Sequence, residues 1–201
     1  MTTARDLAII ALDVKPGLPV EQGDLSLALA GAEVLDLIEA RALVVDGDRI
    51  LPNAQAPTGE RLLDEASEAL RRQEPYESVE DWLWRRGRGL SSAYVDDLER
   101  VGLTARARGR HIPLRTGRTE LVDSAARSRA EDRWVTGEPV LAALASAAGI
   151  RDEPAEDAPE LAGDAAAAVL AAVGGAVQEL RAVRQRRAIE DAAFDNVWRG
   201  L

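Results

Sequence analysis

The apolar residues of this 201-residue chain are mostly small or aliphatic, and this restricts its core more than any other feature. Hydrophobic residues make up 46% of the chain, but aromatic residues only 3%. The core must therefore be built from Leu, Val and Ala. Ala and Leu favour helix, and β-branched residues are too sparse for a β-sandwich or a β-barrel. We predict an all-α fold, a single-domain helical bundle with one or two small β-hairpins.

The residue types that are missing exclude several kinds of chemistry. A chain of this length buries about 70% of its unfolded surface and needs no covalent staple. It contains no Cys and one His, His111, which excludes disulfide frameworks, thiol catalysis and Cys-rich or His-rich metal sites. We find no metal-ligand spacing and no phosphate-binding glycine loop after a strand. We therefore expect no enzyme, no catalytic residue, no metal and no cofactor.

Apolar spacing and cap residues predict the helices. We expect them over residues 25–43, from Thr58, from Ser78 to Gly87, from Ser91 or Ser92, from Thr119 to about Trp134, from Pro139 to Gly149, and from about Asp164. In the first of these, Glu33, Asp36 and Glu39 form one narrow polar stripe, which indicates a central helix. Two hairpins are expected, over 43–51 with a turn at Asp46-Gly47 and over 103–115 with a turn near Gly109.

The remaining segments complete one domain over residues 1–201. Residues 151–160 contain two prolines and five acidic residues, so we expect a loop before C-terminal helices at 161–201. Gly174-Gly175 in the last helix predicts close packing or a kink. The first ten residues lack the apolar run of a signal peptide, and no stretch approaches the roughly 20 apolar residues of a spanning helix. We expect a cytoplasmic protein.

Basic residues gather in one part of an acidic chain. The net charge is −10, from 25 basic and 35 acidic residues. The basic residues are all Arg except Lys15, a bias that suggests a bacterial genome rich in GC. Residues 85–118 nevertheless carry nine arginines against Asp96, Asp97 and Glu99. Such a basic segment favours an anionic partner.

The basic segment fits an anionic lipid surface. Trp84 lies next to arginines; Trp settles at membrane interfaces and Arg donates two hydrogen bonds to phosphate. Trp82 shares a helix face with Val79 and is expected in the core. The candidate lipid-binding residues are Trp84, Arg85, Arg86, Arg88, Arg106, Arg108 and Arg110. At about 1 kcal/mol for each engaged arginine, a few of them bind weakly, so a second contact or self-association is needed.

Two alternatives use the same segment. A helix, the 43–51 hairpin and an arginine-rich stretch also fit a winged-helix DNA-binding protein, although a net charge of −10 repels a polyanion and disfavours nucleic acid. A protein–protein adaptor is the other alternative.

One stretch resembles a known family. Residues 56–66, APTGERLLDEA, are similar to the hallmark of the Golgi phosphoprotein 3 family, PTG followed by LLDEA. Further similar stretches follow in the family's order, at residues 6–13, 29–37, 79–83, 98–103 and 132–135. The resemblance covers about residues 4–150. We interpret Asp64 and Glu65 of the hallmark as structural, because a helix N-terminal turn favours carboxylates.

The resemblance implies a helical bundle with a β-hairpin and no enzymatic activity. Eukaryotic members bind phosphatidylinositol 4-phosphate in a basic pocket and grip the cytoplasmic tails of glycosyltransferases. In this chain residues 19–22 lack the pocket Trp, and Ala30 replaces a pocket Arg. Arg86 or Arg88 could stand in for another pocket Arg, and Ser91 falls at the next place. Residues 106–115 match a hairpin that some members use for self-association.

We therefore expect a bacterial member of this family that is peripheral at the inner face of the membrane. The departures from the pocket favour general affinity for anionic phospholipid headgroups over phosphoinositide specificity. Protein tails and a second copy of the chain are further expected partners.

Overall fold

The computed structural model describes residues 2–13, 20–54, 57–106, 119–150 and 163–199. Its helices are α1 (Thr3–Asp13), α2 (Gln22–Glu39), α3 (Arg61–Glu68), α4 (Val79–Arg86), α5 (Leu90–Arg100), α6 (Ala125–Val135), α7 (Pro139–Ala147) and α9 (Asp164–Arg199). Two antiparallel hairpins pair β1 (Leu43–Asp46) with β2 (Arg49–Pro52), and β3 (Thr104–Arg106) with β4 (Thr119–Leu121). The predicted mainly helical fold with small hairpins is confirmed.

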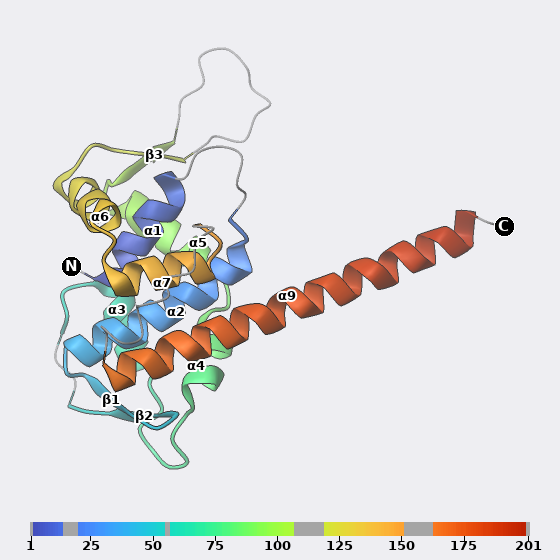
Figure 1. Cartoon of the computed structure of the whole chain (residues 1–201). Coiled ribbons are helices and arrows are strands. Elements are labelled where there is room, and N and C mark those ends of the chain that lie inside the picture. The colour runs from blue at the N-terminus through green and yellow to red at the C-terminus, as the bar shows by residue number, and fades with distance from the viewer. Residues whose placement is uncertain (1, 14–19, 55–56, 107–118, 151–162, 200–201) are drawn as a thin grey trace.

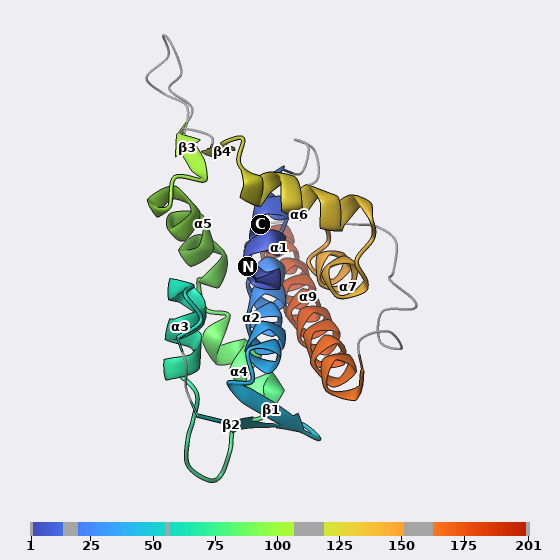
Figure 2. The same cartoon turned by 90° about the vertical axis from the view of Figure 1, so that its left-hand side faces the viewer.

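Helix α2 is the centre of the bundle. It contacts α1, α3, α4, α5, α7 and α9, and in Figures 1 and 2 the other helices surround it. Every residue from Ser26 to Leu37 is buried. This continuous burial confirms that the helix is central, although its polar stripe does not face water. Glu33 and Asp36 are buried, and only Glu39 of the three is exposed.

Helix α9 packs along α2 because two glycines let the backbones approach. A Cβ atom on Gly31 would overlap the side chain of Val173, and one on Gly23 would lie 2.8 Å from Leu180. Gly174 and Gly175 have no such neighbour within 4 Å, so the prediction that they pack closely is wrong. The C-terminal part of α9 extends beyond the other elements (Figure 1).

Helix α9 also corrects an expectation about membrane-spanning segments. From Asp164 to Ala192 it is long and apolar enough, by length and composition, to cross a membrane. The expectation overlooked it because its apolar residues, mostly Ala with some Val and Leu, do not form one uninterrupted run. Only 22% of the most apolar stretch of this helix is buried. The helix nevertheless packs on α2, α4 and α7 and is therefore part of the bundle. A bundle helix can meet the same criterion.

Several predicted boundaries shift by a few residues. The first hairpin turns at Gly47-Asp48, because Asp46 pairs with Arg49. The second pairs residues 104–106 with 119–121 rather than with residues up to 115, and its predicted turn near Gly109 lies outside the described residues. Thr119 therefore begins a strand and not a helix, since a partner strand is available. Helix α6 begins after Ser124, whose hydroxyl accepts a hydrogen bond from the Arg127 amide at 3.2 Å.

Helix caps agree with the sequence at some positions and differ at others. Ser78 caps α4 as predicted, and its hydroxyl accepts from the Asp81 amide at 3.0 Å. Pro139 opens α7 as predicted. Thr58 does not cap α3, which begins three residues later at Arg61. Helix α5 begins at Leu90 after Gly89, so Ser91 lies inside its first turn.

Candidate functional site: a groove at the turn between α4 and α5

The α4–α5 turn places Arg88 against the first turns of α2. Gly89 closes the turn with φ of 71°, a left-handed conformation that favours glycine. Gly87 fits tightly, because a Cβ there would lie 2.6 Å from the Leu83 carbonyl oxygen and 3.4 Å from Leu27. The turn is therefore fixed on α2, and Arg88 is exposed there.

The side chain of Arg85 is held by hydrogen bonds to neighbouring residues of the fold. Its guanidinium donates two hydrogen bonds to the Glu77 carboxylate, at 2.7 and 2.6 Å, and one to the Ala69 carbonyl at 3.2 Å. It also lies 5.0 Å from the centre of the Trp82 ring. Trp82 is fully buried, as predicted, and its indole N–H donates to the Ala30 carbonyl at 3.2 Å. These contacts stabilise the fold around α4.

Arg86 is turned inward. Its guanidinium donates to both oxygens of Glu33, at 2.7 and 2.8 Å, and to the Leu62 carbonyl at 3.0 Å. The Glu33 side chain is 0% exposed and that of Arg86 is 16% exposed. Burial raises the pKa of Glu33, and the hydrogen bonds from Arg86 and Tyr94 oppose that rise. The ion pair is therefore an internal link between α2 and α4.

Arg88 differs from both because it has no ion pair or hydrogen bond with the described residues. Together with Trp84 it borders a groove of about 330 Å³. The other residues around this groove are Gln22, Gly23, Ser26, Leu27, Gly87, Gly89, Ser91, Ser92 and Leu180. The structure thus brings Trp84 and Arg88 of the predicted set together at one concave site.

The N-terminus of α5 forms one wall of the groove. The amides of a helix's first turn carry partial positive charge and favour anions. The Ser91 amide already donates to the Ser26 hydroxyl at 3.0 Å, which joins α5 to α2. Arg88 immediately precedes this helix end, so a cation and a helix N-terminus face the same hollow. A phosphate group suits that combination.

The remaining arginines of the predicted set lie elsewhere. Arg106 is the last residue of β3, which follows α5, whereas Arg88 precedes α5. Helix α5, whose 11 residues span about 16 Å, lies between the two in the chain. Figures 1 and 2 show β3 and α4 at different ends of the bundle. Arg108 and Arg110 lie outside the described residues, as does His111.

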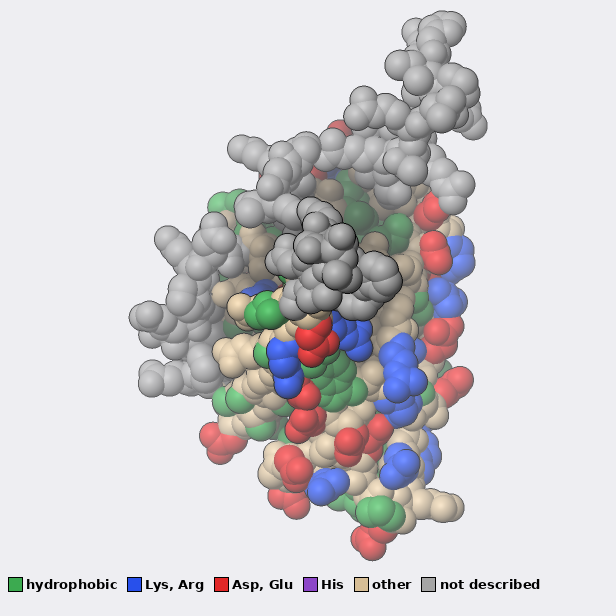
Figure 3. Space-filling view, turned by 90° about the vertical axis from the view of Figure 1, so that its right-hand side faces the viewer, with side chains coloured by type: hydrophobic (Ala, Val, Ile, Leu, Met, Phe, Trp, Pro, Cys, Tyr) green, Lys and Arg blue, Asp and Glu red, His purple; other side chains and the backbone are tan. Residues whose placement is uncertain are grey.

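The surface near the projecting end of α9 is not uniformly basic. On the face in Figure 3, Arg side chains alternate with Asp and Glu rather than forming one broad basic area. For binding an anion, an arginine without a partner among the described residues that borders a groove is therefore more informative than the number of arginines.

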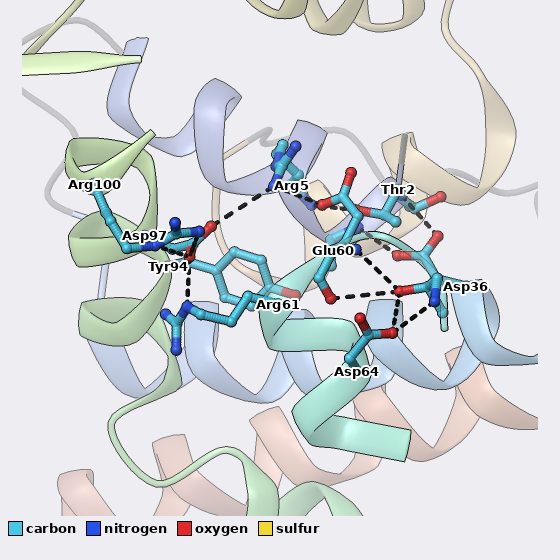
Figure 4. A network of polar contacts seen from close by, with 12 residues as sticks. Thr2, Arg5, Asp36, Glu60, Arg61, Asp64, Tyr94, Asp97 and Arg100 are labelled. Atoms are coloured by element: carbon cyan, nitrogen blue, oxygen red, sulfur yellow. Dashed lines mark hydrogen bonds and ion pairs between the residues drawn. The ribbon is translucent and has the colours of Figure 1, made fainter. Parts of the chain in front are cut away.

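Residues 58–65, which lie in the stretch that resembles the family hallmark, form a network that supports the fold (Figure 4). The Thr58 amide and hydroxyl both donate to Asp64, at 2.6 and 2.7 Å. Arg61 contacts both Glu65 and Asp97, the latter at 2.9 Å. The bonds from Thr58 tie the loop before α3 to that helix, and the pair between Arg61 and Asp97 ties α3 to α5. The interpretation of Asp64 and Glu65 as structural residues agrees with these contacts.

Asp97 is the centre of a second cluster in the same view. The hydrogen bonds from Arg100 and Arg61 lower the pKa of its carboxyl, against the opposing effect of burial. Arg5 of α1 lies 3.7 Å away and also pairs with Glu60 at 2.8 Å. The N-terminal helix is thereby linked to α3 and α5 by charge.

Sequence reasoning did not find Leu180 or Gln22 as residues of the groove. Leu180 is almost a hundred residues from Arg88 in the chain, and it reaches the groove because α9 packs along α2. Arg181 and Arg184 bind the buried Asp24 there, Arg181 at 2.7 Å. In the sequence, Asp24 at the start of α2 and the arginines of α9 were the signal that could have predicted this contact between the two helices. Among the described residues, no group of three or more His, Cys, Asp or Glu side chains could hold a metal ion.

The fold and the groove define a mainly helical protein with a small concave site suited to an anion. The model of one family, described as Golgi phosphoprotein 3 (GPP34), matches residues 4–192. The chain belongs to this family, and the match extends beyond the residues 4–150 that carry the resemblance. The family comprises non-enzymatic phosphoinositide-binding and adaptor proteins that are peripheral on Golgi membranes. No curated protein matches the chain.

Proposed function

We propose that this protein is a non-enzymatic peripheral membrane protein that binds anionic phospholipid headgroups in the groove at Arg88. The observation that carries the proposal is the difference between neighbouring arginines. Arg85 and Arg86 are occupied by Glu77 and Glu33, whereas Arg88 borders a hollow and has no partner among the described residues. Membership of a phosphoinositide-binding family supports the same function.

The headgroup phosphate would accept hydrogen bonds from the Arg88 guanidinium and lie close to the first turn of α5. Trp84 borders the same groove and is suited to the interfacial region, because its indole ring combines an apolar body with a polar N–H. The contribution of Arg106, Arg108 and Arg110 stays a prediction. A cytoplasmic protein would meet such headgroups at the inner face of the membrane.

Co-sedimentation with vesicles tests the proposal. We expect salt-sensitive binding to anionic vesicles and little binding to neutral ones, since the attraction is screened by ions. Replacing Arg88 with Glu should weaken the partition coefficient roughly five- to thirtyfold, as expected for a loss of about 1–2 kcal/mol. Vesicles with and without phosphoinositide, at equal charge, measure the lipid specificity.

Arg129→Glu is the matched control. Arg129 is exposed on α6, away from the groove, and the substitution changes the net charge equally. Equal loss of binding in both variants would show that only net charge matters and would contradict a site at Arg88. Wild-type protein that binds no vesicle would contradict the lipid proposal altogether.

A further inference from the structure

A second hollow adjoins the groove at Arg88. Its volume is about 400 Å³, within the usual range for small-molecule sites. It lies between α1, α2 and α5. Most of its border is apolar: Ala8, Ala11, Leu12, Val20, Leu25, Leu29 and Val95. The polar residues on its border are Gln22, Ser91, Ser92 and Asp96.

The two hollows share one edge. Gln22, Ser91 and Ser92 border both of them. Gln22 and Ser92 are exposed, so the shared edge is open to solvent. Ser91 is 6% exposed, and its hydroxyl forms no hydrogen bond with the described residues. A molecule that bridges the hollows would therefore meet a free hydroxyl at the boundary.

From the groove at Arg88 to the second hollow, the lining residues change from charged to polar to apolar. Arg88 and the N-terminus of α5 offer positive charge at one end. The shared edge then offers neutral hydroxyl and amide groups, and the second hollow offers aliphatic walls. At the rim of that hollow Asp96 is exposed and would repel a phosphate, so an anionic group is directed toward Arg88. This order of charge, polar group and apolar wall matches phosphate, glycerol ester and acyl chain.

We propose that the hollow between α1, α2 and α5 receives one acyl chain of the phospholipid whose headgroup lies at Arg88. The inference rests on the proposed function and adds that the protein takes a chain out of the bilayer rather than touching headgroups alone. The Ser91 hydroxyl would donate to an ester carbonyl oxygen. Each methylene group that enters the hollow increases affinity through apolar burial.

Calorimetry with soluble probes separates the chain from the headgroup. Dihexanoyl phosphatidic acid below its micelle concentration and glycerol 3-phosphate carry the same phosphate with and without acyl chains. We expect wild-type protein to bind the acylated probe at least tenfold more tightly. Ala11→Phe, which fills the hollow, should reduce that ratio to nearly one and leave glycerol 3-phosphate binding unchanged.

Two further variants make the outcomes distinct. Val44→Phe adds the same ring at a residue of β1 that is 49% exposed and far from the hollow, and it should keep the wild-type ratio. Arg88→Glu should weaken binding of both probes. Equal wild-type affinity for the two probes would overturn the acyl-chain inference alone. Undiminished binding of both probes by Arg88→Glu would instead overturn the proposed function.

A measurement on the unmodified protein covers the case in which Ala11→Phe fails to fold. Vesicles containing an anionic phospholipid with a nitroxide in the middle of its acyl chain should broaden the methyl NMR signals of Ala8, Ala11 and Val95. The Val44 methyl signals should broaden less. Equal broadening at all four residues, or none at the first three, would contradict a chain in the hollow.

Discussion

Arg86 and Arg88 are two residues apart in the sequence and have different surroundings in the fold. The first neutralises the buried Glu33, and the second borders a groove without a partner among the described residues. Removing one partner of a buried ion pair leaves an uncompensated charge, which costs much more than removing an exposed charge. The two arginines therefore have separable effects on stability and on binding.

We predict that Arg86→Ala lowers the free energy of unfolding by about 3–5 kcal/mol, whereas Arg88→Ala changes it by at most about 0.5 kcal/mol. Urea denaturation followed by circular dichroism measures both. Similar losses in the two variants would contradict the internal assignment of Arg86. The same contrast recommends Arg88 alone, rather than the three neighbouring arginines together, for tests of lipid binding.

Asp36 predicts a pH dependence of stability. Its carboxylate accepts hydrogen bonds from the Thr3 and Ala4 amides at 2.7 and 2.9 Å. Burial nevertheless raises its pKa to about 6, from an ordinary value of 3.8. Between these two pH values the folded state holds more protons than the unfolded state, so stability falls as the pH rises. At pH 7 the contribution of Asp36 is about 2.4 kcal/mol less favourable than at pH 4.

The measurement compares wild-type protein with Asp36→Asn, which cannot ionise, from pH 4 to pH 7. Because other groups titrate in both proteins, the difference between their unfolding free energies isolates Asp36. We expect that difference to move by about 2.4 kcal/mol in favour of the variant as the pH rises. A shift in favour of the wild type would mean that the pKa is lowered by the helix N-terminus instead of raised by burial.

At the scale of elements, the contact between α2 and α9 depends on missing side chains. Gly31 lets α9 approach because any Cβ would meet Val173, while Gly174 on α9 faces open space. The same residue type thus has opposite roles on the two helices. Close packing of helices requires small residues only at the point of contact.

We predict that Gly31→Ala destabilises the protein by about 1–3 kcal/mol through overpacking. Gly174→Ala should stabilise it by up to about 1 kcal/mol, because alanine is the better helix former where no neighbour interferes. Thermal unfolding of the two variants gives opposite shifts in midpoint. A gain of stability in Gly31→Ala would contradict the close approach of α2 and α9.

At the scale of the whole molecule, the protein is acidic and its proposed ligand is an anion. With a net charge of −10, the molecule as a whole is repelled by an anionic surface at long range. Binding must then come from local geometry, where an arginine, a helix N-terminus and two hollows lie together. The groove exists because α9 returns along α2, so the last part of the chain completes a site begun by the turn after α4.

Much of the fold was predictable from local patterns. The scarcity of aromatic and β-branched residues indicated helices, Ser78 and Pro139 marked helix starts, and Trp82 was assigned to the core from its spacing to Val79. These predictions depend on neighbours in sequence. The strand at Thr119–Leu121 was missed because its partner, residues 104–106, supplies the hydrogen bonds from outside the segment.

The sequence by itself determined the class of fold, the family and the position of the basic segment, because composition, spacing and motif are properties of the chain. The tertiary structure alone decided which arginine is available. Whether a guanidinium pairs with a carboxylate depends on distances between residues such as Arg86 and Glu33, 53 positions apart. Arg85, Arg86 and Arg88 are equivalent in a list of residues. Only packing distinguishes them, because electrostatic attraction depends on distance and burial rather than on order in the chain.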